Sequence, residues 1–278
     1  MKKLYLLTFF TVSVLFSLLS HAANDVPPFD KTKDLLLLNF DLKTDVDDVH
    51  TIAALDLILK AEAFKNLNYF AVSGTYGVQG GLYVPANSLF DLVFKDNWTD
   101  AHLQRKKALN DTTQKVTQVI ASGGRVWVAE AGQSDFTQAV LQHLAQADKA
   151  PTKEQFIVVQ HSTWNENETS KDALAFVKAH TTYIKVPDGN AAENGTPGFN
   201  NTSYSVKKLE ADNLPSSQVW KTANAISSQY NGVNGRYQND SIHYGGTDFS
   251  DLVEVTWLLG ITEVDTVDQF FTKFNTKP

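Results

Sequence analysis

The sequence has no cysteine and only one methionine among its 278 residues. Without cysteine, the chain can form no disulfide framework, no cysteine nucleophile and no cysteine-based zinc site. We therefore expect its stability to come from a hydrophobic core, for which 42% apolar and 11% aromatic residues supply the side chains. A chain of this length forms one large domain or two small ones.

Clusters of basic residues are also missing. The 24 Lys and Arg residues form no run longer than three and are outnumbered by 31 Asp and Glu residues, which gives a formal net charge of −7. A nucleic-acid backbone is held by clustered positive charge, so we expect no nucleic-acid partner. The sequence leaves the oligomeric state open, a homo-oligomer included.

Long apolar runs are absent except at the start of the chain. Lys2 and Lys3 precede an apolar stretch at 4–19, and residues 20–22 (SHA) match the small-x-small pattern of a signal-peptidase site. The stretch has about 16 residues, fewer than the roughly 20 that a membrane-spanning helix needs. Residues 1–22 are therefore predicted to be a signal peptide, and the mature protein to be periplasmic or secreted, with no membrane anchor.

The rest of the sequence alternates between two patterns. Continuous apolar runs such as LLLLNF at 35–40 and FIVVQ at 156–160 are typical of strands buried on both faces of a parallel sheet. Segments free of Gly and Pro, such as 47–64, are typical of helices. The alternation predicts an α/β protein with a mostly parallel central sheet flanked by helices, Rossmann-like and in a single domain.

The predicted elements fill most of the chain. A polar lead-in at 23–34 precedes the domain, which is expected to occupy 35–278. Strands are predicted at 35–40, 67–73, 125–129, 156–160 and 183–186. Helices are predicted at 47–64, 85–94, 111–121, 136–147, 171–180, 219–229, 249–259 and 264–274. Between 187 and 246, Gly, Asn, Ser and Asp dominate, which is typical of long functional or mobile loops.

An acidic segment follows the first predicted strand. Ligands of an open parallel sheet bind at the carboxyl ends of its strands, and here DLKTDVDD at 41–48 places four carboxylates in eight residues. Close like charges destabilise one another unless they share a proton or a cation, and Ca²⁺ takes about six to eight oxygen ligands. Alternatively, Asp47 or Asp48 caps the helix and Asp41 is a solvated loop residue. Four acids at one strand end favour the metal site.

Polar side chains follow two further strands. EAGQSD at 130–135 has a glycine and small polar residues that let the backbone approach a ligand, although Asp135 alone is a fair helix cap. His161, Trp164 and Asn165 follow FIVVQ and suit a sugar, because an aromatic face packs on the ring and amides bind hydroxyls. An ordinary surface turn is the alternative for this second segment.

Two further segments contain glycines beside polar residues. HYGGTDFSD at 243–251 precedes an apolar helix, for which Asp248 and Asp251 form a capping-box-like arrangement. Its glycines and aromatic residues fit a pocket wall equally well. GTYGVQGG at 74–81 lacks the Lys-Ser/Thr of a P-loop and does not match G-x-G-x-x-G, so it gives little indication of phosphate binding.

Taken together, these segments resemble the nucleoside hydrolase superfamily, whose members open with an apolar strand and an Asp-rich motif that ends in Asp-Asp at a helix start. The spacing D-x-x-x-D-x-D-D at 41–48 is most similar to the bacterial nucleoside-hydrolase-related proteins associated with polysaccharide degradation. Residues 131–135 stand in place of the family's Gly-Pro-Leu-Thr-Asn, 162–165 in place of its ribose-binding Asn segment, and 247–248 in place of its late His-Asp pair. The resemblance covers most of 35–259.

The resemblance implies a bound Ca²⁺ and a water activated beside it. Asp48 and Asp248 would be carboxylate ligands, Ser134 would offer its backbone carbonyl, and Asp47 would be the general base for water. Counted back from the Asp-Asp pair, the family's other metal-binding Asp corresponds to Lys43.

Two of the family's residues have changed in this chain. Because Lys43 replaces one metal-binding Asp, Asp41 or Asp45 would substitute for it. Thr247 stands where the family has its leaving-group histidine, which leaves His243 or His161 as replacements.

The sequence therefore supports one leading hypothesis and two alternatives. The leading one is an exported, calcium-binding hydrolase of the glycosidic bond of a nucleoside or a sugar derivative, in which His161, Trp164 and Asn165 bind substrate. No arginine lies beside the acidic motifs to receive a phosphate, so neutral sugars are favoured. Thr247 favours a non-catalytic carbohydrate-binding protein with the same fold and metal. A haloacid-dehalogenase-like phosphatase would need D-x-D where this chain has DLK at 41–43.

Overall fold

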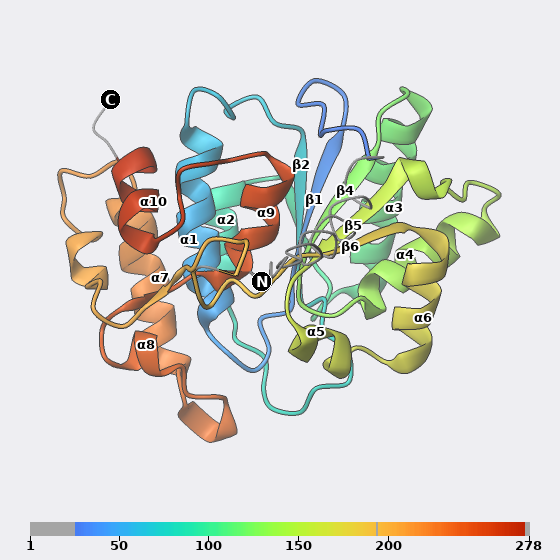
Figure 1. Ribbon diagram of the computed structural model, residues 1–278. Coiled ribbons are helices and arrows are strands. Elements are labelled where there is room, and N and C mark those ends of the chain that lie inside the picture. The colour runs from blue at the N-terminus through green and yellow to red at the C-terminus, as the bar shows by residue number, and fades with distance from the viewer. Residues whose placement is uncertain (1–25, 193, 276–278) are drawn as a thin grey trace, which may run out of the picture.

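Six parallel strands form the centre of the protein (Figure 1). The computed structural model describes residues 26–192 and 194–275, and the predicted signal peptide at 1–22 lies outside the described residues. The strands are β1 (Leu35–Phe40), β2 (Tyr69–Ser73), β3 (Trp98–Asp100), β4 (Val126–Ala131), β5 (Phe156–Gln160) and β6 (Thr182–Lys185). Their order is β3-β2-β1-β4-β5-β6, with every neighbouring pair parallel. The predicted fold class, a Rossmann-like α/β single domain, is confirmed.

The sequence of β1 explains why the sheet is buried on both faces. Successive side chains of a strand point to opposite faces, so Leu36 and Leu38 join one core whereas Leu35 and Leu37 join the other. All six residues of β1 are buried. A continuous apolar run is what a strand covered on both sides requires.

Helices cover both faces of the sheet (Figure 1). The Leu36 side is covered by α1 (Asp47–Lys60), α2 (Asn87–Phe94), α7 (Ser217–Tyr230), α9 (Val253–Leu258) and α10 (Val267–Phe274). The Leu35 side is covered by α3 (Arg105–Ala121), α4 (Asp135–Gln146) and α6 (Lys171–His180). Two short helices, α5 (Thr163–Glu168) and α8 (Asp240–His243), lie in the connecting segments. No helix in the described part of the chain is both long and apolar enough to cross a membrane.

Several element ends differ from the sequence prediction. The helix predicted at 47–64 ends at Lys60, because Ala61 takes an extended backbone with ψ 139°. The helix predicted at 249–259 is divided into a 3-10 turn, Ser250–Leu252, followed by α9. In both places the residues have helix-compatible side chains, so the end is set by backbone geometry that composition does not reveal.

Another helix begins later than predicted. The helix predicted at 264–274 begins at Val267, since the side chains of Thr266 and Gln269 form a capping box across its first turn. Thr266 Oγ1 accepts a hydrogen bond from Gln269 N at 3.3 Å, and Gln269 Oε1 accepts one from Thr266 N at 3.1 Å. The T-x-x-Q spacing is the sequence signature of such a start.

A small second sheet pairs a strand of the irregular segment, residues 187–246, with a strand that directly follows this segment. Strand β7 (Asn200–Asn201) pairs antiparallel with β8 (Thr247–Asp248), and Asn200 lies opposite Asp248. Each strand has two residues, too few for an apolar periodicity to be visible in the sequence. This pairing fixes Asp248 beside residues that lie almost fifty positions earlier.

Candidate functional site

A pocket of about 440 Å³ lies at the carboxyl edge of the central sheet. Its walls include Asp41 after β1, Ala131 at the end of β4, His161 after β5 and Asp188 after β6. The irregular segment and α8 close the opposite side, with Asn239 among the lining residues. Strand ends that are distant in sequence therefore meet in one cavity, as an open parallel sheet requires.

The acidic segment begins with a carboxylate that is held firmly in place. Asp41 Oδ1 accepts a hydrogen bond from Lys43 N at 2.8 Å, and Asp41 Oδ2 accepts from Gln133 Nε2 at 2.8 Å and from Gln79 Nε2 at 3.1 Å. A β-carbon on Gly132 would lie 2.6 Å from Cβ of Asp41, so glycine is needed there for Asp41 to fit. The glycine predicted to allow a close approach thus accommodates a site residue.

Asp48 lies at the back of the pocket and is almost completely buried. Its Oδ2 accepts a hydrogen bond from Leu42 N at 2.7 Å, whereas its Oδ1 has no hydrogen-bond partner within residues 26–192 and 194–275. Leu42 has a φ of 52°, a left-handed conformation that is uncommon for a leucine. Burial, and then the charge of Asp41, raise the pKa of Asp48 well above its usual range.

Asp248 faces this segment from β8. Its Oδ2 accepts hydrogen bonds from Asn200 Nδ2 and Asn239 Nδ2, both at 2.8 Å, and its Oδ1 accepts from Ser250 N at 3.1 Å. Asn239 Nδ2 also lies 3.4 Å from Asp45 Oδ2. The structure therefore joins the first and last acidic motifs of the sequence through one asparagine.

Burial and the charges of their neighbours raise the pKa of several carboxyl groups that line the pocket. Burial raises the pKa of Asp41 to about 6, and burial together with the charge of Asp248 raises the pKa of Asp45 to about 7. The pKa of Asp47 is raised well above its usual range by burial and then by Asp45 and Asp248. Burial and the charge of Asp47 raise the pKa of Asp251 in the same way. Without a cation, several of these groups would hold protons near neutral pH.

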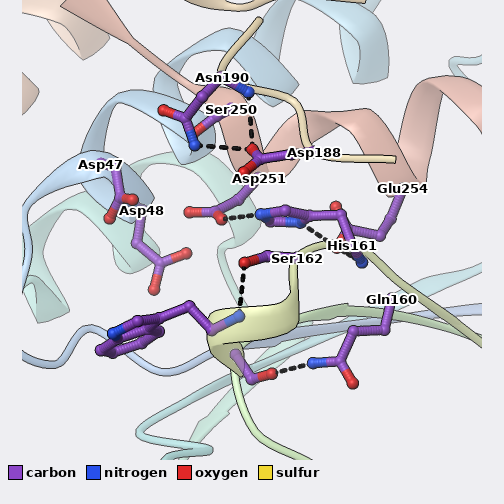
Figure 2. Close-up of polar contacts among 12 residues, drawn as sticks. Asp47, Asp48, Gln160, His161, Ser162, Asp188, Asn190, Ser250, Asp251 and Glu254 are labelled. Atoms are coloured by element: carbon purple, nitrogen blue, oxygen red, sulfur yellow. Dashed lines mark hydrogen bonds and ion pairs between the residues drawn. The ribbon is translucent and has the colours of Figure 1, made fainter. Parts of the chain in front are cut away.

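His161 is fixed at the edge of the pocket by a buried carboxylate (Figure 2). Its Nδ1 lies 2.5 Å from Glu254 Oε1, which also accepts the His161 backbone N–H at 2.9 Å. On the other side of the ring, Nε2 lies 3.4 Å from Asp251 Oδ1. Burial opposes the charged imidazolium, but the carboxylate of Glu254 outweighs it, so the pKa of His161 is raised.

Two exposed aromatic rings belong to the pocket wall. Trp164 is 49% exposed and Tyr237 is 60% exposed, and both line the cavity. Asn165, buried at 6% exposure, lines it as well. Ser162 begins α5 with a φ of 68°, and its Oγ accepts a hydrogen bond from Trp164 N at 3.0 Å, which sets the direction of the chain between His161 and Trp164.

The structure brings together most of the residues selected from the sequence. Those that line the pocket are Asp41, Asp45, Asp47, His161, Trp164, Asn165 and Asp248, whereas Asp48 is buried and is not among the lining residues. Ser134 does not line it, and its carbonyl oxygen accepts a hydrogen bond from Gln138 N as the first acceptor of α4. His243 is exposed outside the pocket, where its ring packs on Tyr244 with centroids 5.0 Å apart.

Three important residues were not selected from the sequence. Glu254 lies within the apolar run VEVTWLL, where the pattern shows only a buried helix. Tyr237 and Asn239 come from a polar loop whose path no local pattern determines. An exposed tyrosine between asparagines is a weak sequence signal for a carbohydrate site, and it is the only one that would have found Tyr237.

The donor atoms suit a hard cation, although they do not surround one point. Among residues 26–192 and 194–275, no three Asp, Glu or His side chains are positioned to hold a metal ion as they stand. Carboxylate oxygens are nevertheless the ligands that Ca²⁺ takes, and Oδ1 of Asp48 is a buried acceptor with no hydrogen bond from any described residue. In chemistry and charge the group fits Ca²⁺. To bind the ion, Asp41 and Asp248 would have to give up hydrogen bonds that they now accept from side-chain amides.

The fold and the pocket define an α/β protein with an acidic, aromatic-flanked cavity at the carboxyl edge of its sheet. No protein-family model and no curated protein sequence matches the chain. A Rossmann-like sheet supports many unrelated functions, so the function must be argued from the side chains of the pocket.

Proposed function

We propose that the protein is an exported hydrolase that cleaves the glycosidic bond of a sugar derivative or nucleoside in this pocket, with Ca²⁺ held by the acidic segment. The observation that carries the proposal is that Asp47 lines the same cavity as Trp164 and Asn165. A carboxylate, an aromatic face and an amide in one small pocket are the groups that a sugar-cleaving site needs. Export rests on the predicted signal peptide at 1–22.

Hydrolysis of a glycosidic bond passes through an oxocarbenium-like transition state, which needs a positioned water, a base for it and contacts to the ring hydroxyls. Asp47 begins α1 and lines the pocket, and in this proposal it accepts the proton of that water. Trp164 would pack on the sugar ring, and Asn165 would bind hydroxyl groups. His161 lies on the other wall, where a leaving group would depart.

The charge of the pocket supports a neutral substrate. Seven aspartates line it, against one lysine, Lys43, and one histidine. The field of these carboxylates repels phosphate and other anions, and no arginine lines the cavity to bind them. This balance weighs against the phosphatase alternative and supports pentoses, hexoses or oligosaccharides as ligands.

Ca²⁺ would be held by Asp48 together with Asp41, Asp45 and Asp248. When bound, the cation would supply a polarised water and the positive charge that keeps neighbouring carboxylates ionised. Asp47 could then act as a base: burial and then the charges of Asp45 and Asp248 raise its pKa, and the ion would offset the effect of those charges. Ser134 is not part of this set, because its carbonyl oxygen already accepts a hydrogen bond from Gln138 N in α4.

A carbohydrate-binding protein without activity is the second candidate. It is favoured by the position of Thr247, which is buried with no partner for its Oγ1 where the resembling family has its leaving-group histidine. The exposed position of His243 points the same way. This candidate would show sugar binding with no bond cleavage.

A screen of the exported form, residues 23–278, separates the candidates. The protein is incubated with Ca²⁺ and either inosine and uridine or neutral p-nitrophenyl pentosides, hexosides and oligosaccharides. Free base, nitrophenol and reducing sugar are then measured. We expect cleavage of a glycoside or oligosaccharide that Asp47→Asn abolishes, with weak or absent release of free base. Sugar binding without cleavage would support the second candidate, and neither cleavage nor binding would overturn both.

A further inference from the structure

Among the residues that the structure describes, the buried carboxylate of Glu254 accepts hydrogen bonds only from His161, a residue that lines the pocket. Glu254 lies in α9 with no exposed surface, and its Oε1 accepts both the backbone N–H and Nδ1 of His161. Its Oε2 has no hydrogen-bond partner among the residues that the structure describes. Burying a carboxylate is costly unless a partner compensates for it, and here the whole compensation comes from His161.

This contact determines which ring nitrogen faces the pocket. Oε1 of Glu254 already accepts the backbone N–H of His161, so it serves as the acceptor for Nδ1 at 2.5 Å as well, and Nδ1 carries the proton. Nε2 is consequently the nitrogen that faces Asp251 Oδ1, at 3.4 Å (Figure 2). The second bond, from the His161 backbone, fixes the end of β5 to the same oxygen, so the ring and its strand are held together.

Negative groups surround the ring on several elements. Glu254 lies in α9, Asp251 in the preceding 3-10 turn, Asp188 after β6 and Asp248 in β8. Burial disfavours the protonated ring, but Glu254, Asp188 and Asp248 favour it, so the pKa of His161 is raised. A protonated His161 would present an Nε2–H to the pocket. The geometry is that of a histidine oriented by a buried carboxylate, an arrangement that enzymes use to hold a proton-transfer group in one tautomer.

We propose that Glu254 is a positioning residue that fixes His161 with Nδ1 protonated and Nε2 facing the pocket, and that His161 Nε2 passes a proton to the departing leaving group. This inference rests on the proposed function. In the step, water attacks the anomeric carbon and the glycosidic bond breaks. The electron pair of that bond goes to the leaving atom, which takes the Nε2 proton, and the water gives its proton to Asp47. Solvent exchange then returns a proton from Asp47 to His161.

The alternative is that Glu254 only stabilises the fold, which predicts a different effect of removing its charge. Glu254→Gln keeps the shape and the acceptor oxygen but removes the negative charge. If Glu254 only stabilises the fold, Glu254→Gln should change the melting temperature and leave the protonation of His161 as it is. A positioning role also changes the protonation of His161 and the pH dependence of turnover, and these do not depend on stability.

The experiment is a nitrogen-15 NMR titration of the histidine rings in the exported protein, with His161→Gln used to assign the signal. In the wild type we expect His161 to show a protonated Nδ1 across the titration. In Glu254→Gln we expect its pKa to fall by at least about one pH unit. Glu62→Gln, which removes an exposed carboxylate, is the matched control and should leave the titration unchanged.

The outcomes separate this inference from the proposed function. A neutral His161 with Nδ1 unprotonated in the wild type would overturn the inference, and this measurement needs no variant that might misfold. An unchanged His161 titration in a folded Glu254→Gln would overturn it as well. If a cleaved glycoside has been found, Glu254→Gln should lower kcat about tenfold or more with KM nearly unchanged, and should move the alkaline limb of the pH profile to lower pH. Absence of any cleaved glycoside would count against the proposed function, while the NMR result would stand.

Discussion

The carboxyl group of Asp48 closes the acidic segment on itself, because its Oδ2 accepts the backbone N–H of Leu42 at 2.7 Å. Leu42 is held in a left-handed conformation by this turn. The second oxygen of Asp48 is buried without a partner, which is costly for a carboxylate.

Calcium should stabilise the wild-type protein. A ligand that binds only the folded state at a hundredfold excess over its Kd adds about 2.7 kcal/mol. At about 2–4 °C for each kcal/mol, 1 mM Ca²⁺ should raise Tm by roughly 5–10 °C relative to EDTA. Asp48→Asn should lose this response, whereas Asp212→Asn, at an exposed aspartate outside the pocket, should keep it. Identical melting curves in Ca²⁺ and EDTA would remove the metal from the proposal.

Asp47 and Asp48 should differ in role although they are adjacent. Asp47→Asn keeps the shape of the side chain but cannot accept a proton, so we expect it to retain the calcium-dependent rise in Tm and to lose hydrolysis by a factor of about 10² or more. Asp48→Asn should lose both. Melting curves with and without Ca²⁺, combined with the cleavage assay, measure the difference. Equal loss of calcium binding in the two variants would show that the roles are wrongly assigned.

The exposed rings of Trp164 and Tyr237 should contribute to sugar binding. Each ring that packs on a sugar is expected to contribute about 1 kcal/mol or more, so Trp164→Ala and Tyr237→Ala should each weaken binding at least about fivefold. Tyr244 is 70% exposed but does not line the pocket, which makes Tyr244→Ala the control. Isothermal titration with the sugar found in the screen measures all three. A loss as large for Tyr244→Ala as for the other two would contradict the placement of the sugar.

A buried glutamate away from the pocket should make stability depend on pH. Burial raises the pKa of Glu130 from 4.5 to about 7, although Thr137 and Asn39 donate hydrogen bonds to it. Because the folded-state pKa is raised, the folded state prefers the protonated acid. Its stabilising effect is full below about pH 4.5 and is lost as the pH rises through about 7.

Glu130→Gln should therefore have a flatter pH profile of stability than the wild type. Between pH 4.5 and 8 the free energy of unfolding of the wild type should fall relative to the variant by up to about 3 kcal/mol. Urea unfolding at a series of pH values measures it, with Glu62→Gln as the exposed control. Parallel profiles for wild type and Glu130→Gln would mean that the pKa of Glu130 is the same in the folded and unfolded states, which would contradict the raised pKa.

The central fold was predictable because burial leaves a simple pattern in the sequence. A strand covered on both faces is mostly apolar, and β1 and β5 are found at the predicted residues, each with a single buried amide near its end, Asn39 or Gln160. Strand β3 has only three residues, WTD, and two of them are polar, so it gives no such pattern. The two-residue strands β7 and β8 were missed for the same reason.

The site was predictable where it depends on the sheet and not where it depends on loop paths. Asp41, His161 and Asp248 were selected because polar residues at strand ends or helix starts meet at one edge, and all three line the pocket. Ser134 and His243 were carried over from a resemblance in order and spacing, which does not determine where a side chain points. The structure does not bring either of them to the pocket.

One wall of the pocket is attached to elements packed in the core, and another comes from the irregular segment at residues 187–246. The acids of 41–48 stand between β1 and α1, both packed in the core, whereas Asn200, Tyr237 and Asn239 come from the irregular segment. Asn200 and Asn239 also donate hydrogen bonds to Asp248, so exchanging either of them would disturb the acidic group itself. Under the proposed function, Tyr237 is instead a position in that segment at which a substitution can alter which sugar fits while the amides that hold Asp248 stay in place.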